Sequence, residues 1–326
     1  MRVLVTGATG FVGTNLVRLL DTQGVDIVAT GAPGSETRYI DACTSDIRLG
    51  DLNDVRFVRE LVEDVDWVFH IAGDTSTWKR FAPRRQAVNV TAVRTLAGAA
   101  LEAGVKRFIH TSTIDVHGYN DNGSSVPEHA AEHLFTGMGY DYAETKTAGE
   151  LEAMKHLGQG LDVVVVYPGF MIGPFDHTLQ LGRVIVDMKQ GKRTFAPPGT
   201  GSFCDVRNVA KGMLAAAEKG RTGNGYNLSG HNLSYSSVFK MIADIVGAEH
   251  DPITIPAPVL EAYGQVAERI SMFTGKVPDM DPGMARYMSA PQASDWSKAN
   301  DELGYTPGNL SAAIQSAAQW YDENVL

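Results

Sequence analysis

The 326-residue sequence has few cysteines, no excess of positive charge and no long hydrophobic run. Its two cysteines, Cys43 and Cys204, exclude a framework of several disulfides, and this low content is typical of the reducing cytoplasm. The formal charge of -10 disfavours nucleic acid as the main partner, because phosphate backbones are bound by basic surfaces. Since no apolar run reaches about eighteen residues, no membrane-spanning helix is predicted. The sequence therefore predicts a cytoplasmic globular protein with neither nucleic acid nor a membrane as its partner.

A glycine-rich segment stands directly after the first apolar run. Residues 1–5 (MRVLV) are predicted to form a strand rather than a signal peptide, and residues 14–20 have the periodicity of a helix. Between them, Gly7 permits a tight turn, Gly10 lets a pyrophosphate approach the main chain, and Gly13 lets the helix pack close to the strand. The N–H groups at the start of such a helix bind anions. This order of elements predicts a dinucleotide site.

Strand-like and helical segments alternate through the first half of the chain. The patterns predict strands over residues 25–30, 65–72, 106–111 and 162–167, and helices over residues 56–63, 87–103 and 142–157. The strand-like runs are nearly continuous in valine and isoleucine, which indicates a parallel sheet covered by helices on both faces. We therefore expect an α/β fold with a Rossmann-type doubly wound sheet, which binds ligands at the carboxyl ends of its strands.

The pattern changes after Tyr167, where prolines and glycines interrupt it. Helices are predicted over residues 181–190, 206–219 and 236–246, and a strand over residues 225–228. We interpret residues 1–169, together with about 203–228, as a dinucleotide-binding domain. Residues of about 170–202 and 229–326 would form a smaller C-terminal substrate-binding lobe. A cleft between the two would hold a small-molecule substrate.

Side chains suited to acid/base chemistry lie on one predicted helix and at the end of the strand before it. Tyr142 and Lys146 are four residues apart on one predicted helix and share a face. An ammonium group beside a phenol favours the phenolate, so we expect Lys146 to lower the pKa of Tyr142 and to make it a proton donor or acceptor. Thr111, Ser112 and Thr113 end the preceding predicted strand, where a hydroxyl group can bind a substrate carbonyl.

The glycine motif, the hydroxyls after the strand and the pair Tyr142–Lys146 together resemble the extended short-chain dehydrogenases/reductases of the NAD-dependent epimerase/dehydratase superfamily. Residues 167–175 (YPGFMIGPF) are similar to its dihydroflavonol reductase-like branch. The resemblance covers essentially the whole chain and implies an NAD(P)-dependent oxidoreductase with Thr113, Tyr142 and Lys146 as catalytic residues. The cofactor residues that it implies are Gly7, Thr9, Gly10, Phe11, Val12, Gly13, Asp51, Leu52, Ala72, Gly73, Asn89, Thr111, Tyr142, Lys146, Pro168 and Gly169. Those expected to face the substrate are Thr75, Thr113, Phe170 and Met171.

The end of the second predicted strand bears on the choice of cofactor. Enzymes that use NAD usually place Asp or Glu there to bind the ribose hydroxyls. Here residues 29–35 (ATGAPGS) contain no acid, and the first one is Glu36. Ser35 and Arg38 can bind a 2′-phosphate that no carboxylate repels. NADP(H) is therefore favoured, and NAD(H) stays possible.

The same catalytic residues serve two kinds of reaction. A reductase or dehydrogenase exchanges hydride with a carbonyl–alcohol pair, whereas a sugar-nucleotide epimerase or dehydratase oxidises its substrate transiently with tightly bound NAD. Similar epimerases carry an arginine for the diphosphate at the position of Gly201, and the second lobe here is rich in Met and Phe instead. We therefore favour a hydrophobic or aromatic ketone or aldehyde as substrate. The epimerase or dehydratase is the alternative, and a non-catalytic cofactor-binding sensor is less favoured because Tyr142 and Lys146 are intact.

One further motif and the oligomeric state bear on partners. His129 to His133 has the H-x-x-E-H pattern of some zinc peptidases. Its place in a polar loop after Pro127 favours a short solvated helix, with a histidine that contacts the substrate as the alternative, and no metal is expected. The chain is expected to be a monomer, or a homodimer that pairs through the helices over residues 87–103 and 142–157, as in relatives of this superfamily.

Overall fold

The computed structural model describes residues 1–128 and 140–326. Over these residues the largest element is a seven-stranded parallel sheet with the strand order β10-β6-β5-β4-β1-β2-β3. Its strands are β1 (Arg2–Thr6), β2 (Asp26–Gly31), β3 (Asp46–Leu49), β4 (Trp67–His70), β5 (Arg107–Thr111), β6 (Val163–Pro168) and β10 (Gly225–Leu228). The order reverses between β1 and β4, so the ligand crevice lies at the carboxyl ends of these two strands. The predicted Rossmann-type α/β fold is confirmed.

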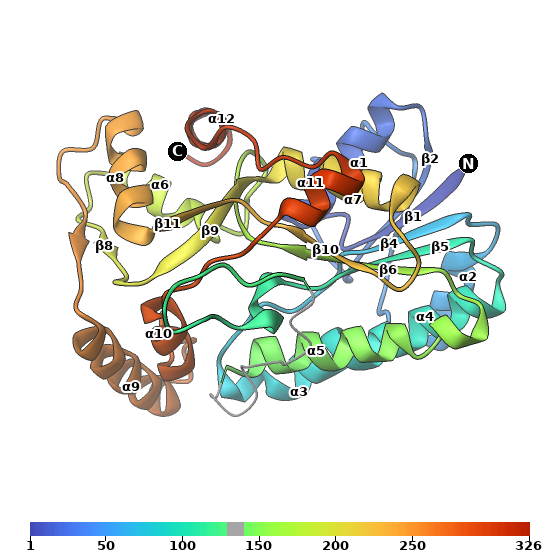
Figure 1. Ribbon diagram of the computed structural model, residues 1–326, viewed down its shortest axis with the longest axis horizontal. Coiled ribbons are helices and arrows are strands. Elements are labelled where there is room, and N and C mark those ends of the chain that lie inside the picture. The colour runs from blue at the N-terminus through green and yellow to red at the C-terminus, as the bar shows by residue number, and fades with distance from the viewer. Residues whose placement is uncertain (129–139) are drawn as a thin grey trace.

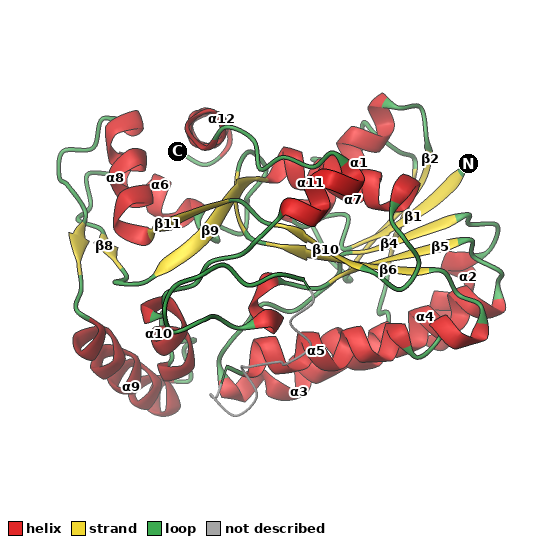
Figure 2. Cartoon of the chain, viewed as in Figure 1, coloured by secondary structure: helices red, strands yellow, loops and turns green. Residues whose placement is uncertain are grey.

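Alternation along the strands divides the core into two layers. In β1, Val3 and Val5 face one set of helices, and Leu4 faces the other. Figures 1 and 2 show the two sets on opposite sides of the sheet. The first contains α1 (Phe11–Thr22), α7 (Val206–Lys219) and α11 (Ser297–Leu303), and the second contains α2 (Val55–Val62), α4 (Ala92–Glu102) and α5 (Asp141–Met154). The sheet is therefore buried on both faces, which explains its continuous valine and isoleucine runs.

The rest of the described chain packs at one end of this sheet (Figure 1). A three-stranded sheet contains β7 (Phe170–Ile172), β9 (Thr200–Asp205) and β11 (His231–Ser234). A two-stranded sheet contains β8 (Phe195–Ala196) and β12 (Ile253–Thr254). Their helices are α6 (Gly182–Lys189), α8 (Tyr235–Val246), α9 (Ala257–Thr274), α10 (Pro282–Ser289) and α12 (Leu310–Asn324). β10 pairs with β6 of the large sheet, and β9 pairs with β7 and β11. The two-domain division stays a prediction.

Predicted and observed elements differ most near residue 90. The single helix expected over residues 87–103 consists of a π-helical turn η2 (Ala87–Thr91) followed by α4, and α3 (Ala82–Gln86) leads directly into it. Residues 87–91 (AVNVT) contain neither proline nor glycine, so their composition does not reveal the wider turn. α7 and β10 have the predicted bounds. Both cysteines are free, and among the described residues no helix is apolar for long enough to cross a bilayer.

Two buried histidines stand side by side on the central strands. His70 on β4 and His110 on β5 are cross-strand partners, and their rings stack with centroids 5.6 Å apart. Burial is the main cause that lowers the pKa of His70 to about 3, and it lowers the pKa of His110 as well. His70 Nδ1 is hydrogen-bonded to Thr6 Oγ1 at 2.8 Å, whereas neither ring nitrogen of His110 has a partner among the described residues. Both rings are therefore neutral in the folded protein.

A neutral buried histidine makes the fold sensitive to acid. Because the folded-state pKa of His70 lies below its unfolded value of 6.5, the stability it contributes is present above pH 6.5 and is lost as the pH falls towards 3. We predict that His70→Asn, which keeps a polar partner for Thr6 but cannot titrate, reduces the loss of unfolding free energy between pH 7.5 and 5 by about 2 kcal/mol. Urea unfolding at the two pH values measures this difference, and equal losses in both proteins would contradict it.

Candidate active site

The glycine motif forms the turn between β1 and α1. Gly7 has a φ of +65°, and a β-carbon there would lie 2.7 Å from the backbone nitrogen of Ala72. A β-carbon on Gly13 would lie 2.0 Å from the carbonyl oxygen of Gly7, so α1 packs directly on the turn. Gly10 is the N-cap of α1, and no side chain caps that helix. The first amides of α1 are therefore left for an anionic ligand.

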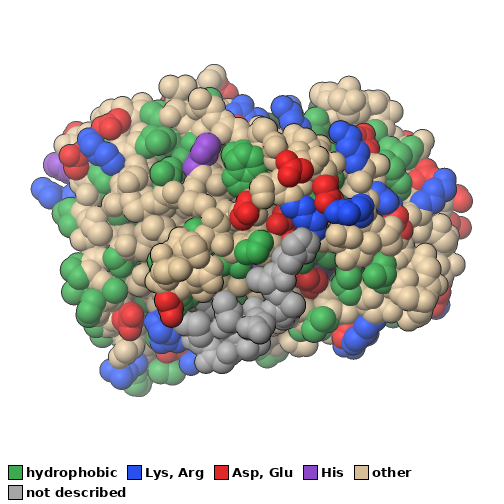
Figure 3. All heavy atoms as spheres, viewed as in Figure 1, with side chains coloured by type: hydrophobic (Ala, Val, Ile, Leu, Met, Phe, Trp, Pro, Cys, Tyr) green, Lys and Arg blue, Asp and Glu red, His purple; other side chains and the backbone are tan. Residues whose placement is uncertain are grey.

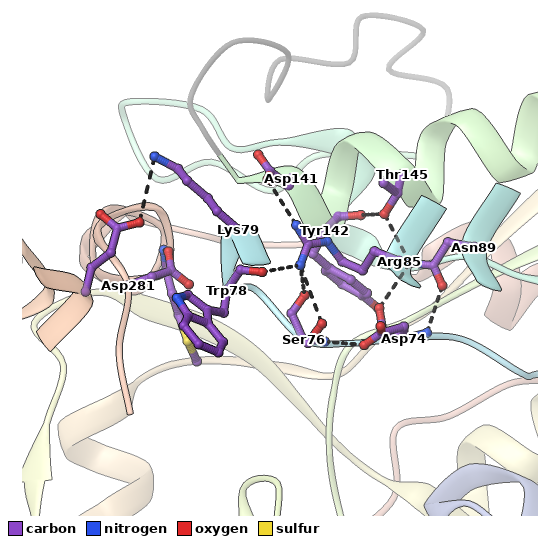
Figure 4. Close-up of polar contacts among 12 residues, drawn as sticks. Asp74, Ser76, Trp78, Lys79, Arg85, Asn89, Asp141, Tyr142, Thr145 and Asp281 are labelled. Atoms are coloured by element: carbon purple, nitrogen blue, oxygen red, sulfur yellow. Dashed lines mark hydrogen bonds and ion pairs between the residues drawn. The ribbon is translucent and has the colours of Figure 1, made fainter. Parts of the chain in front are cut away.

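Asn89, in the π-helical turn η2, holds the loop that follows β4. Its Oδ1 accepts the backbone N–H of Asp74 at 2.8 Å, and its Nδ2 donates to the carbonyl oxygen of Asp74 and to Thr145 Oγ1, both at 3.0 Å (Figure 4). A β-carbon on Gly73 would lie 3.5 Å from Asn89 Oδ1 and 3.7 Å from Lys146 Nζ. Asn89 therefore positions this loop against α5, next to the amine of Lys146.

Helix α5 carries Tyr142 and Lys146 to the carboxyl ends of β4 and β5. The helix approaches closely because a β-carbon on Gly149 would lie only 1.9 Å from the carbonyl oxygen of Asn89 in η2. Lys146 is 4% exposed, and its Nζ donates to the carbonyl oxygen of Thr111 at 2.7 Å. Tyr142, one helical turn earlier, lies near enough to the side chain of Thr113 for that hydroxyl to act on its pKa. The three predicted catalytic residues thus meet at one edge of the sheet.

The electrostatics of Tyr142 differ from the prediction. Lys146 was expected to lower the pKa of this phenol, but the prediction is wrong for this structure: burial raises the pKa of Tyr142, and the charge of Asp115 raises it further. The hydroxyl of Thr113 acts in the opposite direction. Burial also lowers the pKa of Lys146 to about 8, and the amine is engaged by a backbone carbonyl. Tyr142 is therefore held in its protonated form.

Asp115, in the 3-10 turn η3 (Ile114–His117), is a site residue that the sequence did not single out. Its side chain is 7% exposed and accepts hydrogen bonds from the hydroxyls of Tyr140, at 3.4 Å, and Tyr287. Burial raises its pKa to about 6, although the bonds from Tyr287, Thr113 and Tyr140 lower it. The signal in the sequence was an acid inside the otherwise apolar start of η3. This carboxyl group sets the local charge beside Tyr142.

Arg85 is a second residue that the sequence did not reveal. It is 0% exposed, and its Nη1 donates to the carbonyl oxygens of Ser76, at 2.9 Å, and Trp78, at 3.0 Å. Its Nη2 forms a 3.0 Å ion pair with Asp141, the first residue of α5 and the neighbour of Tyr142 (Figure 4). Buried guanidinium groups need such partners, and of its three nitrogens only Nε has none among the described residues. Arg85 therefore fixes the start of α5 against the loop after β4.

An apolar wall faces Tyr142 from β7 and β9. Phe170 and Tyr142 pack against the same cluster around Tyr140 and Tyr287. The ring centroids of Phe170 and Tyr287 are 6.4 Å apart. A β-carbon on Gly201 in β9 would lie 2.8 Å from the Phe170 ring. The wall is therefore aromatic and closely packed where the epimerase resemblance expected an arginine.

The end of β2 holds the residues proposed to distinguish the cofactors. A β-carbon on Gly31 would lie 2.6 Å from Thr9 Oγ1 and 3.3 Å from the Ser35 β-carbon, so this loop lies against the glycine turn. Arg38 is exposed, and its Nε lies 3.5 Å from a carboxylate oxygen of Glu36. The guanidinium group therefore already has an acidic partner within its own loop, which a phosphate would have to displace.

The other predicted cofactor residues lie at the start of α1 and after strands β3 and β6. Phe11 and Val12 open α1, and Asp51 and Leu52 follow β3, where the exposed Asp51 binds the side chain of its neighbour Asn53. Pro168 ends β6, and Gly169 donates its N–H to the Leu228 carbonyl at 3.2 Å.

The structure places two of the predicted substrate residues as follows, and their role stays a prediction. Met171 packs against the sheet core rather than the aromatic wall, because side chains alternate along β7. Thr75 is exposed in the loop after β4, next to Asp74, whose charge acts on Tyr142. The H-x-x-E-H stretch from His129 to His133 lies outside the described residues. Within the described part, no group of three potential ligands is placed to bind a metal.

These residues fit a nicotinamide dinucleotide. The turn at Gly7 and Gly13 has no space for side chains and presents an uncapped helix start, which suits a pyrophosphate. The buried hydroxyls of Thr111 and Ser112 have no hydrogen-bond partner among the described residues, and the amine of Lys146 stands between them and Gly73. Buried donors without partners favour a polar ligand at this position.

Comparison with known proteins agrees with this geometry. Residues 3–229 match the model of the NAD dependent epimerase/dehydratase family. The chain is 31% identical to sterol demethylase protein B of Methylococcus capsulatus, with 99% of each chain covered. It is 29% identical to a putative dihydroflavonol 4-reductase of Synechocystis, covering 98% of this chain and 94% of the relative. Among solved structures, gox2253 superposes with a TM-score of 0.86 at 26% identity, covering 99% of this chain and 98% of that chain.

The match extends over most of the chain, and the elements that it spans include β1 to β6 with their glycine turn and α5 with Tyr142 and Lys146. The predicted resemblance to the extended short-chain dehydrogenases/reductases is therefore confirmed. The chain belongs to the NAD-dependent epimerase/dehydratase family and is an enzyme of this oxidoreductase type.

Proposed function

We propose that the chain is an NADP(H)-dependent reductase or dehydrogenase that acts on a hydrophobic or aromatic ketone or aldehyde and the corresponding alcohol. The observation that carries this proposal is the contact between Gly201 and the ring of Phe170. An arginine at Gly201 would collide with that ring. Arg207, just beyond β9, is bound to Asp205 at 2.6 Å. This wall favours an apolar substrate over a sugar diphosphate, in keeping with relatives named for a sterol and a dihydroflavonol.

The catalytic roles follow from the contacts of the three predicted residues. In the reductive direction, Tyr142 donates its phenolic proton to the carbonyl oxygen, which Thr113 helps to orient by a hydrogen bond. When bound, the nicotinamide supplies hydride to the carbonyl carbon. A raised pKa keeps Tyr142 protonated before this step, and the amine of Lys146, beside the Thr111 carbonyl and Gly73, would hold the ribose of the nicotinamide.

The preference for NADP(H) rests on the loop after β2. No carboxylate stands between Gly31 and Ser35 to repel a 2′-phosphate. The guanidinium of Arg38 can exchange its exposed pairing with Glu36 for the more strongly charged phosphate. Exposed ion pairs of this kind contribute little free energy, so the exchange has a small cost.

We predict that Tyr142→Phe lowers turnover of a hydrophobic carbonyl panel by about a hundredfold or more, because the variant lacks the transferable proton. NADPH consumption measures turnover, and NADPH fluorescence titration should show that cofactor binding remains. Tyr263→Phe, which changes an exposed tyrosine on α9, is the matched control and should behave as the unmodified protein. Unchanged turnover in Tyr142→Phe across the panel would remove Tyr142 from the mechanism.

For the cofactor, we predict that NADPH binds more tightly than NADH and that Arg38→Ala weakens NADPH binding by about tenfold or more. Binding of NADH should change little, because NADH has no 2′-phosphate. Arg56→Ala, at an exposed arginine on α2 paired with Glu60, is the control. A purified protein that retains non-exchanging NAD and shows no net turnover would instead favour the epimerase or dehydratase alternative.

The charge of Asp115 should appear in the pH profile of the oxidative direction, which requires the Tyr142 phenolate. Asp115 raises the pKa of Tyr142, so Asp115→Asn should move the midpoint of alcohol oxidation to lower pH by about one unit. Since the pKa of Asp115 is about 6, its carboxyl is neutral below that value, and both proteins should respond alike there. An unshifted midpoint would show that Asp115 does not act on Tyr142.

A further inference from the structure

Helix α9 exposes apolar side chains along one side. Its buried residues, Leu260, Gly264 and Ser271, form the side that faces the protein. On another side lie Val259, Tyr263, Val266, Ile270 and Phe273, which we call the apolar face of α9. Phe273 is 91% exposed and the other four are about half exposed. Steps of four and three residues place all five on one stripe of the helix, so this is an organised surface and not scattered exposure.

The apolar surface continues beyond the helix. Phe195 on β8 and Ile253 on β12 are cross-strand partners, and both are exposed. β12 ends three residues before α9 begins. In Figure 3, hydrophobic and basic side chains, with some acidic ones among them, occur along the edge where Figure 1 places α9.

The charges near this face are mainly basic, although the chain as a whole is acidic. Arg269 and Lys276 are exposed beside the stripe and just after the helix. The guanidinium group of Arg80 lies at the C-terminal end of α9, because a β-carbon on Gly275, the C-cap, would lie 3.6 Å from one of its nitrogens. Of the two acids on α9, Glu268 lies 3.8 Å from Lys79 with its side chain 18% exposed, and Glu261 is half-buried. An acid in the following loop, Asp279, is exposed. The surface thus combines an apolar stripe with four basic residues, Arg269, Lys276, Arg80 and Lys79, against these three acids.

From these observations we propose that the apolar face of α9 docks onto the surface of an anionic lipid bilayer. An amphipathic helix with aromatic and aliphatic residues on one face and basic residues at its side binds in the plane of such an interface. This is contact with the surface and involves no spanning helix. Anionic headgroups are complementary to Arg269, Lys276 and Arg80, and the protein's remaining charge is screened beyond about 8 Å at physiological ionic strength.

A second copy of the chain suits this face less well. A helix of eighteen residues is about 27 Å long and about 10 Å wide. Pairing along the helix alone, without Phe195 and Ile253, covers roughly a third of the about 800 Å² per partner that a stable interface needs. A bilayer requires no complementary shape and can accommodate the whole stripe.

The position of α9 connects the surface with the active site. α9 packs on α10, which carries Tyr287, and Tyr287 hydrogen-bonds to Asp115 beside Tyr142. Figure 1 shows α9 and α10 together at the end of the molecule away from β1 to β3. A bilayer at this face would lie one helix away from the aromatic wall. The docking surface itself goes beyond the proposed function and does not depend on it.

Flotation with vesicles tests the proposal. We expect the protein to bind vesicles of phosphatidylcholine mixed with phosphatidylglycerol, and to bind phosphatidylcholine alone more weakly. Phe273→Glu should reduce binding to the mixed vesicles by about tenfold or more, because it removes a phenyl group and adds a like charge. Arg269→Glu should reduce binding to the mixed vesicles and leave binding to phosphatidylcholine unchanged. Leu151→Glu, at an exposed leucine on α5, is the matched control and should bind as the unmodified protein.

Three outcomes would overturn the proposal: no vesicle binding by the unmodified protein, equal binding by Phe273→Glu, or a dimer by light scattering that Phe273→Glu dissociates. Circular dichroism confirms that the variants are folded. Reduction of a water-soluble aromatic aldehyde by Phe273→Glu should equal that of the unmodified protein. Lack of this activity in both proteins would reject the proposed reaction and leave the docking surface intact.

Discussion

The contact between α5 and the π-helical turn is the constraint on which the rest of the site depends. Gly149 places the helix against the carbonyl oxygen of Asn89 with no room for a β-carbon. From this position Lys146 reaches the Thr111 carbonyl, and Thr145 receives the side chain of Asn89. Asn89 therefore fixes helix α5 through its backbone carbonyl and the loop after β4 through its side chain. A side chain at 149 would move both catalytic groups away from the sheet edge.

Burial then determines the charge states around this contact. Tyr142 and Asp115 have raised pKa values and Lys146 a lowered one, so each group is shifted towards its neutral form. Arg85 has a different role, because its guanidinium group is buried against a carboxylate and two carbonyl oxygens and holds the backbone at the start of α5. The groups with shifted pKa values lie around the phenol of Tyr142. Such clustering of shifted pKa values is typical of catalytic sites.

Short-range patterns predicted much of the architecture. The strands β1, β2, β4, β5 and β6 follow from apolar runs that a sheet buried on both faces requires, and the glycine turn follows from the spacing of Gly7, Gly10 and Gly13. β3 was not predicted because its residues are only partly buried and its sequence, DIRL, is half charged. The π-helical turn was not predicted because its residues, AVNVT, include no proline or glycine that would mark a break in the helix. α9 was hidden by the prolines around its start, although Pro258 is compatible with a first helical turn.

The sequence by itself determined the sheet, the glycine turn and the pairing of Tyr142 with Lys146, because periods of two and four residues fix which side chains share a face. Only the tertiary structure decided that Asp115 and Tyr287, which are distant in sequence, meet beside Tyr142. It also decided that Arg85 is a buried anchor and that Phe170 covers Gly201. Local patterns cannot contain this information, because a pKa and an ion pair depend on burial and on distances between segments far apart in the chain.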